Sequence, residues 1–212
     1  MKKQTQNGYD NTTPDPIFRS FKEMEDFMQG VLRPSLEPKE IEHVVLDADD
    51  TMWQIQPWGV ASGVSPIGHT DEDELPVKLR REGLAYMPEL WEEVLPTGRI
   101  TLDPTLRDTL DKLKDKAISV SIASINTKDS VMRFLEAFGL EDKFVDVEAN
   151  LGESKGKMVS RIAKRQNIDT DKMLFVNDSF LNGLDVARET AATPLIMGYN
   201  IGSIAEIMEF IK

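Results

Sequence analysis

A short apolar segment that runs directly into a cluster of carboxylates constrains this chain more than any other feature. Residues 43–46 (His-Val-Val-Leu) precede residues 47–51 (Asp-Ala-Asp-Asp-Thr), so three carboxylates fall within four positions. Carboxylates this close raise one another's pKa unless a cation or a set of backbone N–H groups neutralises them. Asp and Thr are also ordinary turn and helix N-cap residues. The rest of the chain must therefore decide between a cap and a divalent-metal site.

Apolar segments alternating with amphipathic ones predict a parallel sheet. The expected strands are 44–46, 117–123, 144–147, 173–176 and 195–197. Apolar residues at helical spacing predict helices between them, one capped by Asp103 and the last spanning 201–211. Strands and helices in this order form a three-layer α/β/α, Rossmann-like fold with right-handed crossovers. Ligands of such sheets bind beyond the carboxyl ends of the strands, where residues 47–51 lie.

Two segments fall outside this alternation. Residues 1–40 combine a polar tail with apolar residues at helical spacing over 17–32, which predicts a helical extension before the α/β domain over 41–212. Residues 53–98 are expected to form a long irregular loop or a minimal cap insertion, and the charged segment 71–82 is compatible with a helix. A connection this long is usually functional.

The charge of the chain limits its partners. Its 212 residues contain 37 acidic and 25 basic side chains, a net charge of −12 at pH 7. This charge repels nucleic acid and anionic membrane surfaces, and no apolar run is long enough to span a bilayer. The chain contains no Cys, which excludes disulfides and Cys nucleophiles. We therefore expect a soluble, cytoplasmic protein that binds neither nucleic acid nor membranes; nothing in the sequence sets its oligomeric state.

Polar residues also lie near the ends of other expected strands. Ser124 and Asn126 follow the second strand, Asp178 follows the fourth, and Lys155 precedes a helix. In a parallel sheet these positions share one edge with Asp47. Each residue alone could be a cap or a surface charge. Together they supply the carboxylates, hydroxyl and ammonium of a phosphoryl-transfer site, in which a bound cation would offset the negative charge of the chain.

In the order and spacing of these motifs, residues 43–212 resemble the haloacid dehalogenase superfamily. Residues 47–51 match its Asp-x-Asp-x-Thr motif, and the three later motifs are similar to residues 122–124 (Ile-Ala-Ser), 152–155 (Gly-Glu-Ser-Lys) and 174–178 (Leu-Phe-Val-Asn-Asp). The Thr-Met-Trp run at 51–53 and the spacing of the later motifs are most similar to the magnesium-dependent phosphatase branch, subfamily IIIC. That branch also contains the glyceryl-transferring proteins of polyketide pathways.

The resemblance implies a phosphatase that works through an aspartyl-phosphate. It implies that Asp47 is the nucleophile, that Asp49 is the general acid and base, and that Lys155 holds phosphoryl oxygens. Lys157 is an alternative for this lysine. The implied Mg²⁺ ligands are Asp47, Asp49 through its backbone carbonyl, and Asp178; the implied substrate-binding residues are Thr51, Ser124 and Asn126.

The resemblance leaves the substrate open between a phosphorylated small molecule and a phosphoprotein, because a site without a large cap admits both. The chain departs from the branch at Asn177, where a second acid is usual, and weaker metal binding is expected there. Asn177 and the N-terminal helix motivate an alternative, a non-hydrolytic module that handles carrier-bound acyl groups or serves as a phosphate-binding scaffold. A receiver-type signalling domain is disfavoured, because Asp49 would hydrolyse a phospho-aspartate too quickly.

Overall fold

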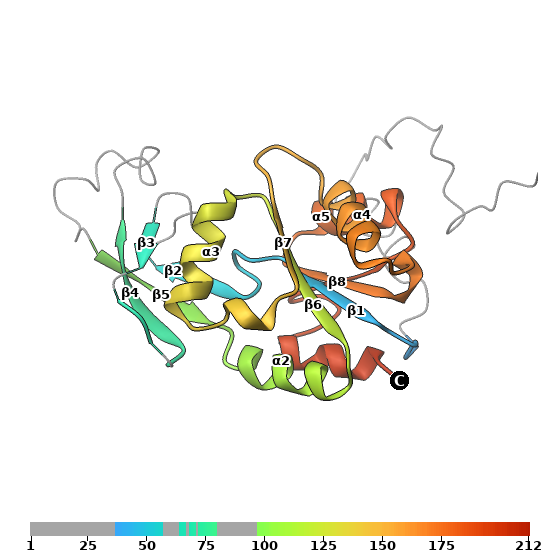
Figure 1. Ribbon diagram of the computed structural model, residues 1–212, viewed down its shortest axis with the longest axis horizontal. Coiled ribbons are helices and arrows are strands. Elements are labelled where there is room, and N and C mark those ends of the chain that lie inside the picture. Colours follow the sequence, from blue (N-terminus) through green and yellow to red (C-terminus); the bar gives the residue numbers. More distant parts are fainter. Residues whose placement is uncertain (1–36, 57–63, 67, 71, 80–96) are drawn as a thin grey trace, which may run out of the picture.

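A computed structural model describes residues 37–56, 64–66, 68–70, 72–79 and 97–212; the helix expected at 17–32 lies outside these ranges. A five-stranded parallel sheet forms the centre of the molecule, in the order β7-β6-β1-β8-β9 (Figure 1). Its strands are β1 (His43–Leu46), β6 (Ser119–Ser124), β7 (Asp146–Ala149), β8 (Met173–Asn177) and β9 (Thr193–Ile196). The predicted parallel α/β sheet is thereby confirmed, with the third strand two residues further along the chain.

Helices cover both faces of this sheet. Figure 1 shows α4 (Lys155–Gln166) and α5 (Phe180–Glu189) on one face and α2 (Leu106–Asp115) on the other. The second face also carries α3 (Lys128–Ala137) and the 3₁₀ helix η6 (Ile204–Phe210); two further 3₁₀ turns are η4 (Glu141–Lys143) and η5 (Thr170–Lys172).

The alternation of side chains along β1 explains the two layers. Val45 packs in one apolar cluster with Met158 of α4, whereas Val44 and Leu46 belong to the cluster that contains Phe134 of α3. All four residues of β1 are buried, as expected for a parallel strand covered on both faces. β1 lies between β6 and β8, so the residue after it reaches the middle of the carboxyl edge of the sheet.

A second, antiparallel sheet in the described part of 53–98 corrects the expectation of a long irregular loop there; the alternative, a minimal cap insertion, stays a prediction. Its order is β2-β5-β4-β3, from β2 (Trp53–Gln56), β3 (Val64–Pro66), β4 (Glu74–Leu79) and β5 (Thr97–Leu102). The helix considered for 71–82 is wrong, because residues 74–79 form the strand β4. Buried and exposed residues alternate along β2, which is the period of a half-buried strand. The prolines and glycines of this segment hid that period in the sequence.

Two helix boundaries also differ from expectation. Asp103 was expected to cap a helix, but α2 begins at Leu106, and Asp103 Oδ1 instead accepts a hydrogen bond from the Thr105 backbone N–H at 2.8 Å. The C-terminal helix expected over 201–211 is the 3₁₀ helix η6, which starts only at Ile204 because Ser203 has an extended backbone.

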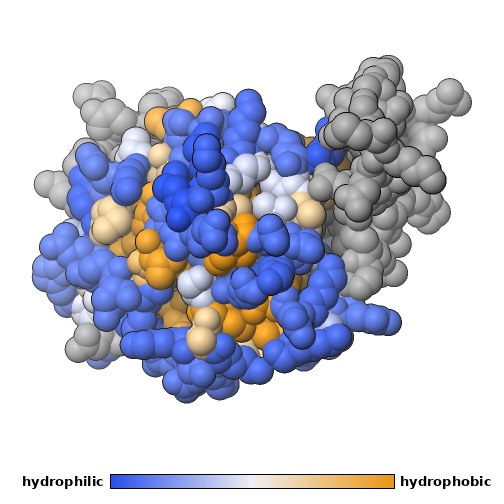
Figure 2. Space-filling model, turned by 45° about the vertical axis from the view of Figure 1, so that its right-hand side comes forward, coloured by the Kyte–Doolittle hydropathy of each residue, from blue (hydrophilic) through white to orange (hydrophobic). Residues whose placement is uncertain are grey.

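The surface is largely hydrophilic on the face shown in Figure 2, with smaller apolar areas between the charged side chains. In the described ranges, no helix combines the length and the apolar character that crossing a bilayer requires.

Candidate active site

A buried pair of opposite charges lies at the carboxyl end of β1. The backbone N–H of Asp47 donates to Val176 O at 2.8 Å, which continues the pairing of β1 with β8. Asp47 Oδ1 accepts hydrogen bonds from the Ala48 backbone N–H at 2.7 Å and from Lys155 Nζ at 2.5 Å. Lys155 Nζ also donates to Ala123 O at 2.6 Å. Relative exposures of 6% for Asp47 and 1% for Lys155 show that water barely reaches either residue.

Burial has the largest effect on the pKa of the Asp47 carboxyl group. Burial raises its pKa from 3.8 to about 6, against the lowering effects of Lys155 and of the Ala48 backbone N–H. The charge of Asp178 raises it further. A buried carboxylate with a shifted pKa and a specific charged partner is typical of a functional site. Oδ1 carries both hydrogen bonds, so Oδ2 is the oxygen available to a ligand.

The geometry distinguishes the two candidate lysines. Lys155 is the first residue of α4, and its side chain points into the protein toward Asp47. Lys157 is exposed, and its backbone N–H donates to Ser154 Oγ at 3.4 Å, which caps the helix. The structure therefore brings Lys155, and not Lys157, to the carboxylate cluster.

Both carboxylate oxygens of Asp49 accept hydrogen bonds from buried side chains. Trp53 Nε1 donates to Oδ1 at 2.9 Å, and Asn126 Nδ2 donates to Oδ2 at 3.1 Å. The Asn126 Oδ1 accepts from the Thr127 backbone N–H at 2.8 Å. Trp53 packs against Phe134, with ring centroids 5.5 Å apart. The sequence analysis placed Asn126 in the site and left Trp53 out; the one signal for Trp53 was its position in the Thr-Met-Trp run.

Two further carboxylates face this region. Partial burial and the charges of Asp178 and Asp49 raise the pKa of Asp50. Partial burial also raises the pKa of Asp178, helped by the charge of Asp49 and opposed by Lys155. In both groups burial is the largest cause of the raised pKa, and the charge of neighbouring carboxylates adds to it. The negative charge that these carboxylates carry when ionised would attract a cation.

The donor set fits Mg²⁺ and a phosphoryl group. Within the described residues, three buried polar atoms near this edge have no hydrogen-bond partner, and these are Thr51 Oγ1, Ser124 Oγ and Asn177 Nδ2. Buried polar groups are normally paired, so such atoms at a strand end suggest a ligand. No three His, Asp or Glu side chains in those ranges lie close enough together to hold a metal on their own. A carboxylate pair completed by carbonyl, phosphate and water oxygens is the usual Mg²⁺ environment.

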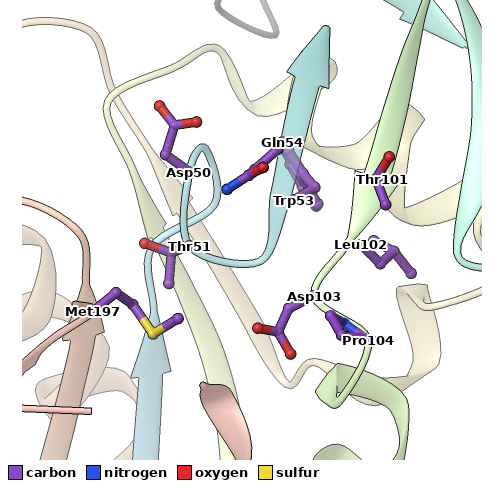
Figure 3. Close-up of a pocket in the computed structure, with 9 residues that line it drawn as sticks. All are labelled: Asp50, Thr51, Trp53, Gln54, Thr101, Leu102, Asp103, Pro104 and Met197. Carbon is purple, nitrogen blue, oxygen red and sulfur yellow. The ribbon is translucent and has the colours of Figure 1, made fainter. Parts of the chain in front are cut away.

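A pocket of about 200 Å³ lies beside the loop that follows β1 (Figure 3). Its lining residues are Asp50, Thr51, Trp53, Gln54, Thr101, Leu102, Asp103, Pro104 and Met197. Asp47, Ser124 and Lys155 do not line it. The pocket thus lies beside the carboxylate site and is lined by the loop after β1 and by the end of β5 of the small sheet.

The chain belongs to the haloacid dehalogenase-like hydrolases, because the model of that family matches residues 64–189, more than half of the sequence. The match includes Ser124, Lys155 and Asp178 and begins after Asp47 and Asp49. No curated relative matches the chain.

Several solved structures share the fold. A subfamily IA hydrolase of the same superfamily from Geobacter sulfurreducens is 15% identical over 81% of this chain and 100% of its own, with a TM-score of 0.54. A predicted phosphoglycolate phosphatase from Haemophilus somnus is 16% identical over 80% and 97%, with a TM-score of 0.53. CbbY from Rhodobacter sphaeroides, solved with phosphate, is 15% identical over 79% and 96%, with a TM-score of 0.51. At these identities the similarity establishes the fold alone.

Proposed function

We propose that this hydrolase is a magnesium-dependent phosphatase that forms an aspartyl-phosphate on Asp47. The observation that carries the proposal is the 2.5 Å contact between Asp47 Oδ1 and Lys155 Nζ at the carboxyl edge of the sheet. This contact holds Oδ1 of Asp47 in place and leaves Oδ2 free to attack phosphorus. The phosphatases among the structures that share this fold support the same class of reaction.

The two halves of the reaction use the two carboxyl groups in sequence. Asp47 Oδ2 attacks phosphorus, the bond between phosphorus and the leaving oxygen breaks, and Asp49 gives its proton to that oxygen. A water molecule then attacks the phosphorus of the aspartyl-phosphate while the Asp49 carboxylate takes a proton from it. The bond from Asp47 Oδ2 to phosphorus breaks, and inorganic phosphate and the original carboxylate are released.

The remaining residues would bind and neutralise the phosphoryl group. Lys155 supplies a fixed positive charge, and the unpartnered Ser124 hydroxyl can donate to a phosphoryl oxygen. Mg²⁺, when bound, would supply positive charge for the phosphoryl oxygens. Its ligands would be the Asp47 and Asp178 carboxylates and the Asp49 carbonyl. Asn177 Oδ1 already accepts from the Ser179 backbone N–H at 2.9 Å, so it supports the strand end more than the metal.

The proposed substrate is a phosphorylated small molecule or a phosphoprotein. The net charge of −12 argues against nucleic acid, and the absence of Cys fits a cytoplasmic location. We also propose that Thr51 and Asn126 bind the substrate. In this structure Asn126 Nδ2 donates a hydrogen bond to Asp49.

The direct test is hydrolysis of para-nitrophenyl phosphate with and without Mg²⁺. We expect magnesium-dependent turnover in the wild type and a loss of at least about 1,000-fold in Asp47→Asn, because the nucleophile is removed. Asp108→Asn is the matched control: Asp108 is an exposed aspartate of α2, paired with Lys112, and its substitution should leave turnover unchanged. Full turnover in Asp47→Asn would overturn the proposal. No turnover in a folded wild-type protein that binds Mg²⁺ would instead favour the non-hydrolytic module.

A further inference from the structure

We propose that Trp53 and Asn126 are a pair of positioning residues that hold the general acid and base, Asp49, from both of its oxygens. This inference rests on the proposed function and names the residues that fix the orientation of the proton donor. The two donors reach separate oxygens, at 2.9 Å from Trp53 Nε1 and 3.1 Å from Asn126 Nδ2.

The two donors come from different parts of the fold. Trp53 opens β2 of the small antiparallel sheet, and Asn126 follows β6 of the central sheet. An isolated bridge between Asp49 and Trp53 adds a backbone connection to the side-chain contact. The orientation of the Asp49 carboxylate therefore depends on how the small sheet is seated against the central one.

Each donor is itself held in place. Both Trp53 and Asn126 are 1% exposed. The indole ring of Trp53 packs against Phe134 of α3, and the Asn126 Oδ1 accepts from the Thr127 backbone N–H. Neither donor can turn away without losing packing or a second hydrogen bond. The pair thus differs from flexible surface donors, which follow a carboxylate as it rotates.

This arrangement fits the chemistry expected of Asp49. A carboxylate offers about four acceptor positions, so two donors leave one position on each oxygen for a proton or for water. With the plane of the group fixed by charge-assisted hydrogen bonds, Asp49 can give a proton to the leaving oxygen and later take one from water without reorienting. Proton transfer of this kind needs a positioned group.

The test compares two esters that differ in their need for a proton. Phenol leaves poorly without protonation, whereas para-nitrophenol leaves readily as its anion. Trp53→Phe keeps an aromatic ring against Phe134 and removes only the N–H. We expect kcat/KM, which reports the steps up to departure of the alcohol and excludes hydrolysis of the aspartyl-phosphate, to fall about tenfold on phenyl phosphate in Trp53→Phe. The loss of kcat/KM on para-nitrophenyl phosphate should be less than about threefold, since general acid catalysis contributes about 10²–10⁴ in total.

Leu113→Ala is the structural control, because it removes buried side-chain volume from α2 and leaves both donors of Asp49 in place. It should lower thermal stability and change turnover of both esters by the same factor. If Trp53→Phe does not fold, Asn126→Ala removes the other donor and is measured with the same two esters.

Equal losses of kcat/KM on both esters in a folded Trp53→Phe protein, or no loss on either, would overturn the inference and leave the phosphatase intact. A wild-type protein inactive on both esters would refute the proposed function and the inference with it. The ratio of the two rates therefore distinguishes the two failures.

Discussion

The acid sensitivity of the fold can be predicted from one buried histidine. His43 begins β1 and is fully buried, with Nδ1 2.5 Å from Ser119 Oγ and Nε2 2.9 Å from Ser121 Oγ. A neutral ring, which donates through one nitrogen and accepts through the other, satisfies both hydroxyls. Burial lowers the pKa of His43 from 6.5 to about 4, although the charge of Asp146 opposes the shift.

The size of the stability loss follows from the pKa values of His43 in the unfolded and folded states. The difference between 6.5 in the unfolded chain and about 4 in the folded protein corresponds to about 3 kcal/mol of stability. The folded pKa is depressed, so this stability is present above pH 6.5 and is lost as the pH falls through about 4. Between pH 7 and pH 5 the unfolded chain takes up about three-quarters of a proton at this residue and the folded protein about a tenth. The expected loss over that interval is about 2 kcal/mol.

Urea unfolding of the wild type and of His43→Gln, measured from pH 7 to pH 5, tests this prediction. Gln is neutral throughout and keeps hydrogen-bonding groups near the two serines. Carboxylates titrate alike in both proteins, so the difference between their free energies of unfolding isolates His43. We expect that difference to shrink by about 2 kcal/mol as the pH falls. Parallel pH profiles for the two proteins would show that the buried ring does not resist protonation.

Two other predictions concern α4. Lys155→Met should lower kcat on para-nitrophenyl phosphate by about 100-fold or more, because it removes a charge that the proposed site places beside the transferred phosphoryl group. Lys157→Met should leave kcat unchanged. Equal effects of the two substitutions in steady-state assays would contradict the assignment of Lys155. Gly156→Ala should destabilise the protein by about 1–3 kcal/mol in urea unfolding, because an added Cβ would lie 2.7 Å from Asp185 O of α5. The control is Ser160→Ala, at an exposed position of the same helix, whose free energy of unfolding should stay within about 0.5 kcal/mol of wild type. Equal free energies of unfolding for Gly156→Ala and Ser160→Ala would show that α4 and α5 can separate without cost.

The parallel sheet and the edge that carries the site could be predicted from the sequence. Long apolar runs ending in polar residues locate β1, β6 and β8, and parallel strands bring their ends together. The order of apolar and polar segments is therefore enough to place Asp47, Lys155 and Ser124 at one edge. The roles assigned to them remain proposals.

Other features depend on tertiary contacts that no local pattern records. Lys155 and Lys157 are two residues apart on one helix turn, and only the packing of α4 on the sheet buries one and exposes the other. The hydrogen bond from Trp53 to Asp49 requires the tight turn in which the Met52 N–H donates to Ala48 O at 2.9 Å. The small sheet was missed because proline and glycine interrupt the alternation of its strands.

The central place of β1 also has a consequence for synthesis of the chain. His43 pairs with Ser119 on one side and with Met173 on the other, so the second partner is made roughly 130 residues after β1. At ordinary translation rates this is a delay of roughly 7 to 26 s. During that time an apolar strand has an open edge, which is the kind of segment that pairs with other chains. A nascent chain that stops before β8 is therefore expected to need a chaperone, and the proposed site, which includes Asp178, can form only in chains that have passed that point.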